Sequence, residues 1–347
     1  MSDLDKLLAQ YDYPISPQQI AQKPRTPRDS ARLLIYDRKT NTTEFDSYKN
    51  LAKHIPLNAL LVFNDTKVIP ARIPGRLSTG GKVELLCTKF EPKRLWALCE
   101  RSLANGQSIW LSKSHVLTVV EKVGKEYQLE LPEKFDIRGF MKRHGVTPLP
   151  PYLKLSPLSE KERRTRYQSV FAQHEGSIAA PTASLHFTPR VFRSLEKAGV
   201  ETAFVTLHVN LGTFLPLTDQ NITEGKLHEE YFEISKSAAK KIREAKRHGR
   251  PVIPVGTTAL RTLESCAQPL LSERLTRSLS GTTRLFIQEG YAFRIADGLI
   301  TNFHVPRSSL MMLVAALVGR KRILDLYALA RQRDFTFFSF GDGMLIR

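Results

Sequence analysis

The sequence predicts a two-part protein, in which a small all-β module interrupts a mixed α/β main domain. The chain has 347 residues, more than a single hydrophobic core usually supports. Residues 73–131 carry short β-like runs at regular spacing, a pattern typical of a small barrel or sandwich. After Tyr152, helical and strand-like patterns alternate, which favours a mixed or parallel sheet covered by helices.

The elements before Tyr152 follow from local patterns. Residues 60–69, LLVFNDTKVI, predict a strand, a turn and a second strand, because Asn64 and Asp65 favour turns. Glycines at 80–81, 106 and 124 separate the β-like runs of the module, and prolines 148, 150 and 151 give it a stiff exit. The five β-like runs are 83–89, 95–100, 108–111, 116–120 and 127–131.

The elements after Tyr152 are marked mainly by capping residues. Ser159 and Glu162 form a potential capping box for a helix that we expect to continue into YQSVFA, 167–172. Further helices are predicted to begin at Thr188-Pro189, Ser235, Thr257 and Ser308, the first ending at Gly199 and the second at Gly249. The predicted strands are AFVTLHV (203–209), PVIPVG (251–256), LFI (285–287) and YAFRI (291–295).

A strong positive charge favours a polyanionic partner. The chain has 52 Lys and Arg against 34 Asp and Glu, a net charge of +18. Such a surface attracts RNA or DNA, and the alternatives are an anionic membrane or a basic proteome. Any one basic cluster is usually a solvated helix face, but three of them suit phosphate contacts. The clusters are 161–166, 240–250 and 320–322.

Several classes of protein are disfavoured. Three widely spaced cysteines form no disulfide framework and no zinc spacing. The first ten residues lack an apolar signal core, and the longest apolar run, 310–318, is far short of the roughly 20 residues of a membrane span. The dispersed histidines match no compact metal motif. We therefore expect a cytoplasmic protein without a membrane segment or a bound metal.

Five polar stretches are candidate site loops. The stretch 255–265 combines a strand end, Gly256, Thr257 and Thr258 with a helix start, where unpaired N–H groups bind anions. In isolation each stretch is explained as well by an ordinary loop, turn or structural histidine. The other four are 176–188 with Thr182 and His186, 206–214 with Thr206 and His208, 301–310 with Asn302 and His304, and 337–347 with Asp342.

Eleven motifs in order resemble the S-adenosylmethionine:tRNA ribosyltransferase-isomerase family of queuosine biosynthesis, from about Tyr11 to Ile346. They are LLVFNDTKVIPARIPG, TGGKVELL, PLPPYL, RYQSVFA, GSIAAPTASLHFT, VTLHVNLGTF, HEEYFEI, VGTTALRTLES, FIQEGYAF, TNFHVPRSSLMMLVAALVG and FFSFGDGMLI. The resemblance implies a discontinuous α/β (mixed α+β) catalytic domain, 1–72 and 149–347, with an inserted six-stranded antiparallel β-barrel, 73–148.

The resemblance also implies a reaction. S-adenosylmethionine is the co-substrate, and its ribosyl moiety is transferred and isomerised onto 7-aminomethyl-7-deazaguanine at the wobble position of tRNA. Epoxyqueuosine forms, and adenine and methionine leave; no metal is needed, and the enzyme is expected to be a monomer. The sulfonium acidifies the ribose C5′ protons, so one base could form an ylide.

The resemblance gives the candidate residues expected roles. His186 or His208 is the base or the purine acid, and Thr182 and Thr206 line the donor pocket. Gly256, Thr257 and Thr258 hold the methionine carboxylate. Asn302 and His304 hold the ribose or the acceptor base, Asp342 is a candidate for binding the aminomethyl cation, and Glu230 and Arg261 orient neighbours.

The chain departs from the family pattern at a few positions. The family usually has Gly at positions 184 and 210, Ala at 343, Pro at 289 and Ser at 31, where this chain has Ser184, Asn210, Gly343, Glu289 and Ala31. These changes affect loop geometry more than chemistry. Two alternatives stay open from the residues alone: an RNA-binding protein without catalysis, and a metal-dependent hydrolase built from the histidines.

Overall fold

The main domain is built on one large mixed sheet. The computed structural model describes residues 2–210 and 217–347, and within them nine strands form this sheet. In spatial order they are β15 (Leu279–Leu285), β13 (Lys226–Ile234), β12 (Glu201–Leu207), β3 (Leu60–Asn64), β14 (Val252–Val255), β16 (Leu299–Asn302), β17 (Gly343–Ile346), β1 (Arg32–Asp37) and β2 (Thr42–Ser47). A short parallel pair, β4 (Thr66–Val68) with β11 (His174–Ser177), lies beside it.

The centre of the sheet is parallel. Strands β12, β3, β14 and β16 all run in the same direction, and antiparallel strands extend the sheet at both sides. β3 and β14 are buried on both faces, as their unbroken apolar sequences LLVF and VIPV require. The carboxyl ends of the four parallel strands therefore meet at one edge of the sheet.

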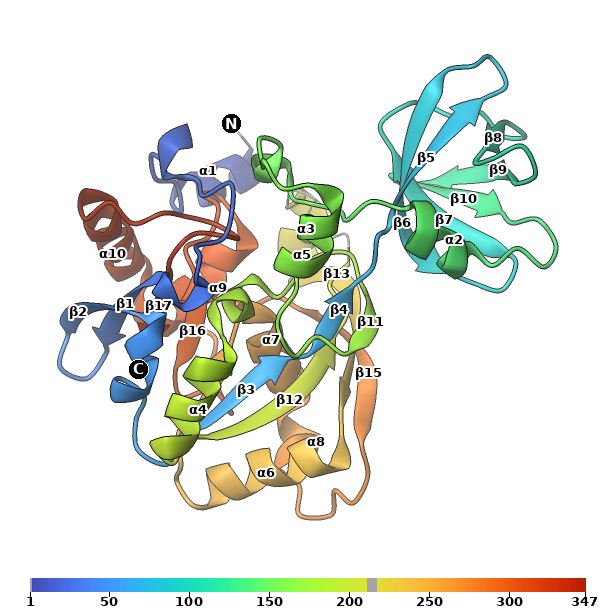
Figure 1. Cartoon of the computed structure of the whole chain (residues 1–347). Helices are drawn as coiled ribbons and strands as arrows, with labels where there is room; N and C mark the ends of the chain where they lie inside the picture. Colours follow the sequence, from blue (N-terminus) through green and yellow to red (C-terminus); the bar gives the residue numbers. More distant parts are fainter. Residues whose placement is uncertain (1, 211–216) are drawn as a thin grey trace.

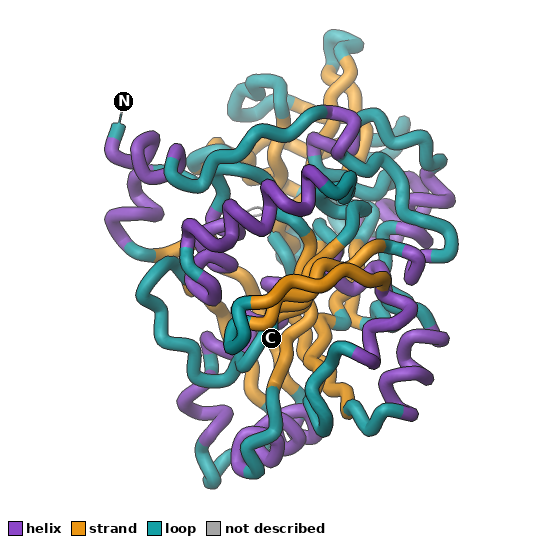
Figure 2. The backbone as a smooth tube through the Cα atoms, turned by 90° about the vertical axis from the view of Figure 1, so that its left-hand side faces the viewer, coloured by secondary structure: helices purple, strands orange, loops and turns teal. Residues whose placement is uncertain are grey.

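Helices cover both faces of the sheet, as Figure 2 shows edge-on. Leu60 and Val62 of β3 share a core with residues of α6 and α7, whereas Leu61 and Phe63 pack with α4 and the 3-10 turn η3 (Tyr48–Lys53). This alternation is the period of two expected for a strand between two layers. The main-domain helices are α4 (Pro189–Lys197), α6 (Lys236–Arg247), α7 (Thr257–Ser265), α8 (Ala267–Leu271), α9 (Ser309–Val318) and α10 (Arg320–Gln332), with short α1 (Asp3–Ala9), α3 (Glu160–Arg166) and α5 (Asp219–Glu224).

The inserted module is a closed six-stranded antiparallel barrel, so the sandwich alternative is wrong. Figure 1 shows the chain leaving β3 through β4 to reach it. Its strands are β5 (Arg72–Leu77), β6 (Lys82–Phe90), β7 (Arg94–Cys99), β8 (Ser108–Trp110), β9 (Val116–Val123) and β10 (Glu126–Glu130). Helix α2 (Ile137–His144) packs Phe140 and Met141 against the barrel core. The domain boundaries at 73 and 148 stay a prediction.

Three predicted elements differ in the structure, one helix and two strands. The capping box of Ser159 and Glu162 is confirmed, but α3 ends at Arg166 and YQSVFA is not helical. The reason is that the Gln168 side chain pairs with both backbone groups of Val68, at 3.1 and 2.8 Å, which holds this segment beside β4.

The predicted strand YAFRI is also absent, and of LFI only Leu285 belongs to a strand. The backbone N–H groups of Arg294, Ile295 and Ala296 instead donate to the Glu264 carboxylate at 2.9–3.0 Å. One buried carboxylate thus accepts the hydrogen bonds that the backbone of a neighbouring strand would otherwise accept. Within the described residues, the helices are too short or too polar to cross a membrane.

Candidate active site at the carboxyl edge of the sheet

Four parallel strands deliver polar residues to one edge of the main sheet. Among the four parallel strands, the one that follows β3 in the chain is β12, its neighbour on one side, and the one that follows β14, after β15 at the sheet's edge, is β16, its neighbour on the other side. In open α/β sheets the crevice that binds ligands lies outside the carboxyl ends of the strands at such a point, which is here between β3 and β14. The predicted stretches 176–188, 206–210, 255–265 and 301–302 all reach this edge, whereas residues 211–214 of the second stretch lie outside the described residues.

Asn64 joins the two sides of the crevice. Its amide exchanges hydrogen bonds of 3.0 Å with the backbone N–H and C=O of Leu207, so it continues the pairing of β3 with β12. Its Nδ2 also donates to Thr258 Oγ1 at 3.1 Å, at the start of α7. The side chain is fully buried, so it fixes the two strand ends relative to each other.

Among the described residues, no side chain caps the start of helix α7 at the crevice. Gly256, the residue before the helix, has φ +92°, a conformation that favours glycine. Because glycine has no side chain, it cannot cap the helix. Its own N–H donates to Ile300 O at 2.7 Å. The first N–H groups of a helix have no intrahelical partner, so the turn of Thr257 and Thr258 presents donors and a positive dipole end. Binding of an anion by Gly256, Thr257 and Thr258 stays a prediction.

Thr182, Asn302 and His186 form one hydrogen-bonded chain. Thr182 Oγ1 donates to Asn302 Oδ1 at 2.8 Å, and Asn302 Nδ2 lies 3.2 Å from His186 Nε2. His186 is buried against the Tyr48 ring, with ring centroids 4.5 Å apart. Burial lowers the pKa of His186 to about 4, although Asp342 opposes the shift. His186 is therefore neutral at pH 7 and lies beneath Asn302.

His208 is the histidine that lies on the more open side of the edge. Its Nδ1 is 2.8 Å from Thr66 Oγ1, and its ring stacks on Tyr231 with centroids 6.0 Å apart. A Cβ at Gly176 would lie 2.8–2.9 Å from three of its ring atoms, so only glycine leaves room for the ring. Burial, then the nearby His174 and Arg138, lower the pKa of His208, which favours the neutral imidazole.

A carboxylate that was not among the predicted site residues lies at the end of β3. Asp65 follows β3 and accepts a 2.7 Å hydrogen bond from Thr206 Oγ1. Its other oxygen is 3.7 Å from His174 Nε2. Burial raises the pKa of Asp65, although the Thr206 hydroxyl and His174 oppose this. Its position directly after a buried parallel strand was the signal that could have identified it.

His304 lies on the opposite face of β16 from Asn302. Thr301 and Asn302 are consecutive strand residues, so their side chains point to opposite faces. His304 Nε2 is 2.7 Å from Thr301 Oγ1. The backbone N–H of His304 donates to Oη of Tyr327, a residue of α10, at 2.8 Å. Burial lowers the pKa of His304 to about 4. His304 thus belongs to the opposite layer from His186.

The Asp342 carboxylate is already engaged by protein donors. Arg25 donates to both oxygens, at 3.1 and 3.2 Å, and the backbone N–H of Arg32 donates at 2.7 Å. Thr336 adds its N–H at 2.8 Å and its hydroxyl at 3.0 Å. Asp342 is fully buried, so its contacts are those of an anchor that joins three chain segments.

A buried ion pair lies behind the edge. Arg261 of α7 contacts Glu230 of β13, and its Nε donates to Leu285 O at 3.1 Å. Glu230 also accepts from the N–H of Asn210 at 3.4 Å. The pair therefore ties α7 to the strand that flanks His208. Among residues 2–210 and 217–347, no group of three or more His, Cys, Asp or Glu side chains has the geometry of a metal site.

Comparison with known proteins gives consistent results. The model of a family described as queuosine biosynthesis protein matches residues 8–346. The chain is 43% identical to the S-adenosylmethionine:tRNA ribosyltransferase-isomerase of Carboxydothermus hydrogenoformans, over 98% of this chain and 99% of that protein. It is 40% identical to that of Halothermothrix orenii, over 97% and 98%. A crystal structure of S-adenosylmethionine tRNA ribosyltransferase from Thermotoga maritima shares 30% identity, with a TM-score of 0.56 over 97% of this chain and 100% of that chain.

Proposed function

The chain belongs to the queuosine biosynthesis family of S-adenosylmethionine:tRNA ribosyltransferase-isomerases, and we propose that the crevice between β3 and β14 is its catalytic centre. The enzyme transfers and isomerises the ribosyl moiety of S-adenosylmethionine onto tRNA, with adenine and methionine as leaving products. The proposed acceptor is the 7-aminomethyl-7-deazaguanine wobble base. The donor, the acceptor and a proton acceptor must then meet at one edge of the sheet.

The start of α7 binds the methionine end of the donor. A carboxylate placed there accepts from the first N–H groups of α7, which follow Gly256, and the helix dipole stabilises its charge. Asn64 fixes the Thr258 hydroxyl beside it. The observation that supports this assignment is the position of Gly256 directly after β14, next to the carboxyl end of β3.

His208 acts as the base that removes a C5′ proton. The Thr66 hydroxyl directs its own proton to His174 O, at 3.5 Å, so its oxygen accepts from Nδ1–H of His208. The lone pair is then on Nε2, and the lowered pKa keeps the ring neutral and able to accept a proton. His186 is a positioning residue, because its contact to Asn302 holds the amide that Thr182 also engages.

Asp65 receives the aminomethyl cation of the acceptor base. It is nearly buried, and a carboxylate whose pKa is raised by burial gains most from an incoming cation. Thr206 holds it in place at 2.7 Å. Asp342, the earlier candidate for this role, would first have to release Arg25.

Adenine release tests the proposed function. Purified protein with S-adenosylmethionine and an acceptor tRNA should release adenine, and the release should require the modified wobble base. A protein that only binds RNA releases none under these conditions. A metal-dependent hydrolase loses its activity on chelation, whereas the transferase retains it.

A further inference from the structure

We propose that the cavity between the barrel and the main domain binds one nucleotide of the RNA substrate next to the modified base, with its base on Phe90 and its phosphate between Lys67 and Lys142. This inference rests on the proposed function, since it requires an RNA acceptor that reaches His208. The occupant is a nucleotide of the same RNA chain, and it gives the barrel a part in substrate binding.

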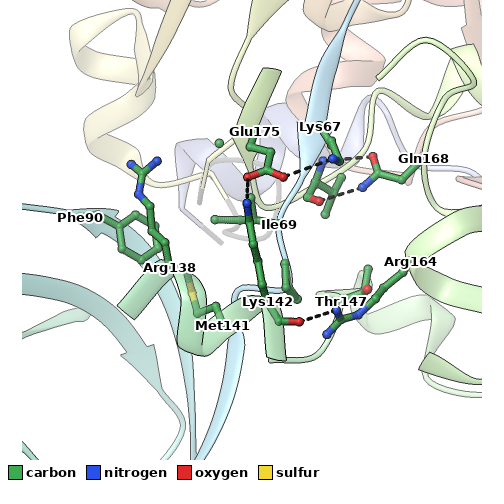
Figure 3. A pocket seen from close by; sticks show the side chains of 13 residues that line it. Lys67, Ile69, Phe90, Arg138, Met141, Lys142, Thr147, Arg164, Gln168 and Glu175 are labelled. Atoms are coloured by element: carbon green, nitrogen blue, oxygen red, sulfur yellow. Dashed lines mark hydrogen bonds and ion pairs between the residues drawn. The ribbon is translucent and has the colours of Figure 1, made fainter. Parts of the chain in front are cut away.

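The cavity lies between the barrel and the segments β4 and β11 that carry Lys67 and Glu175, as Figure 3 shows. It has a volume of about 240 Å³, with Phe90 and Met141 on the barrel side and Lys67 and Val68 on the main-domain side. Gly176 lines it as well, and the His208 ring packs against Gly176. A nucleotide in the cavity is therefore a direct neighbour of the modified nucleobase when that nucleobase is positioned at His208.

One carboxylate joins the two lysines across the cavity. Glu175 of β11 is 3.2 Å from Lys67 Nζ through one oxygen and 2.9 Å from Lys142 Nζ through the other. Lys142 belongs to α2 and Lys67 to β4, so the carboxylate links the barrel to the main domain. The two lysines, Lys142 first, lower the pKa of Glu175 and keep it charged.

A phosphodiester matches the position of the Glu175 carboxylate between the lysines. Like the carboxylate, it carries one negative charge and two acceptor oxygens, and Lys side chains are common phosphate partners in RNA complexes. Arg164 also lines the cavity, but it is held by Glu160 at 2.8 Å and by the carbonyl of Lys142 at 2.7 Å. An RNA phosphate can therefore replace Glu175 as the partner of the two lysines.

The barrel side of the cavity offers a surface for a base. The Arg138 guanidinium lies 5.6 Å from the centre of the Phe90 ring, and both residues line the cavity. Unstacked RNA bases bind to aromatic faces and to guanidinium planes. A cavity with cations at one end and an aromatic-guanidinium pair at the other fits a nucleotide better than it fits an apolar ligand or a lone anion.

Binding of a labelled anticodon stem-loop to the full-length protein tests the base contact. Phe90→Ala should weaken binding roughly 5- to 150-fold, as expected for the loss of one stacked base, and Phe90→Tyr should retain it. Trp110→Ala is the matched control, because Trp110 is an exposed aromatic residue of the barrel that does not line the cavity. Equal affinities for Phe90→Ala and the wild type would overturn the inference.

The salt dependence of binding tests the phosphate contact. Lys142→Ala should lower the slope of log affinity against log salt by about 0.7 to 1, the loss of one phosphate contact, whereas the exposed Lys113→Ala should not. Glu175→Gln should bind RNA severalfold more tightly, because it removes the competing charge. Weaker RNA binding by Glu175→Gln would contradict the phosphate site. It would mean that the ion pairs of Glu175 with Lys67 and Lys142 only hold the two domains together.

Kinetics separate this inference from the proposed function. Phe90→Ala and Lys142→Ala should each raise KM for the stem-loop without changing KM for S-adenosylmethionine or the rate at saturating RNA. A wild-type protein that releases no adenine would refute the proposed function. An active wild type, with variants whose KM for RNA is unchanged, would refute only the nucleotide site.

Discussion

Asn64 at the end of β3 donates a hydrogen bond of 3.1 Å to the Thr258 hydroxyl at the start of α7, across the crevice in which the donor is proposed to bind. The same amide pairs with both backbone groups of Leu207 on the other side of β3. One buried side chain therefore sets the relative positions of two strand ends and the start of α7. The proposed catalytic groups lie at these ends, so changes here should affect both activity and stability.

Asn64→Ala should impair both stability and donor binding. The change leaves the Leu207 N–H and C=O without their partner, so the free energy of unfolding should fall by about 1–3 kcal/mol. KM for S-adenosylmethionine should rise, because Thr258 loses the contact that orients it. Urea denaturation and steady-state kinetics measure the two effects. Thr258→Val should reproduce the rise in KM with a smaller loss of stability, and a normal KM in both variants would contradict the role of the pair.

Gly176→Ala should reduce turnover more than stability. The added Cβ would lie 2.8–2.9 Å from three atoms of the His208 ring, so the ring must move. A displacement of the base by about 1 Å lowers the rate by roughly 10- to 100-fold. Gly281→Ala is the control, because its Cβ would meet only the Phe232 ring at 3.6 Å. Turnover that is the same in both variants would show that the His208 ring need not be held in place.

The two-part architecture was predictable from the sequence, but of the nine described strands of the main sheet only β3, β12 and β14 were predicted from local patterns, together with the last residue of β15. Capping residues such as Thr188, Ser235 and Ser308 marked three helix starts, and all three cap in the structure. The missed elements lack such signals. The strand β5 contains Pro74 and Gly75, which resemble a turn, and its partners in the closed barrel lie on β6 and β8.

The candidate site was less predictable, because its contacts join distant parts of the chain. Thr182 and Asn302 are hydrogen-bonded although 120 residues separate them. The sequence pattern pointed to three histidines of similar context, yet the sheet places His186 and His304 on opposite faces. The alternation of side chains along a strand predicts that Thr301 and Asn302 point to opposite faces of the sheet. Only the topology shows which helices cover each face.

Acid should destabilise the folded enzyme through its buried histidines. Burial lowers the pKa of His186 and of His304 from 6.5 to about 4, so the unfolded chain binds more protons between these values. Stability contributed by the neutral rings is present above pH 6.5 and is lost as the pH falls toward 4. Each histidine should contribute a slope of up to about 1.4 kcal/mol per pH unit. Urea denaturation from pH 7.5 to 5 measures the slope, and His304→Gln should reduce it; an unchanged slope would exclude His304 as a source.

Gly343 and Tyr48 should be coupled energetically. A Cβ at Gly343 would lie 2.2 Å from Tyr48 Oη, so Gly343→Ala alone should destabilise the protein by about 1–3 kcal/mol through overpacking. The Tyr48 hydroxyl is buried and has no hydrogen-bond partner among the described residues. Tyr48→Phe should therefore be neutral or stabilising by up to about 1 kcal/mol.

The double variant Tyr48→Phe/Gly343→Ala separates this coupling from independent effects. Removal of the hydroxyl leaves Thr301 O, at 2.9 Å, and the Tyr48 Cζ, at 3.1 Å, as the remaining close neighbours of the new methyl group. The double variant should thus recover most, but not all, of the stability that Gly343→Ala loses. Additive changes in the free energy of unfolding would mean that the hydroxyl does not limit the size of residue 343. A non-additive result would show that glycine at position 343 accommodates the hydroxyl of a tyrosine whose ring packs on His186, with ring centroids 4.5 Å apart.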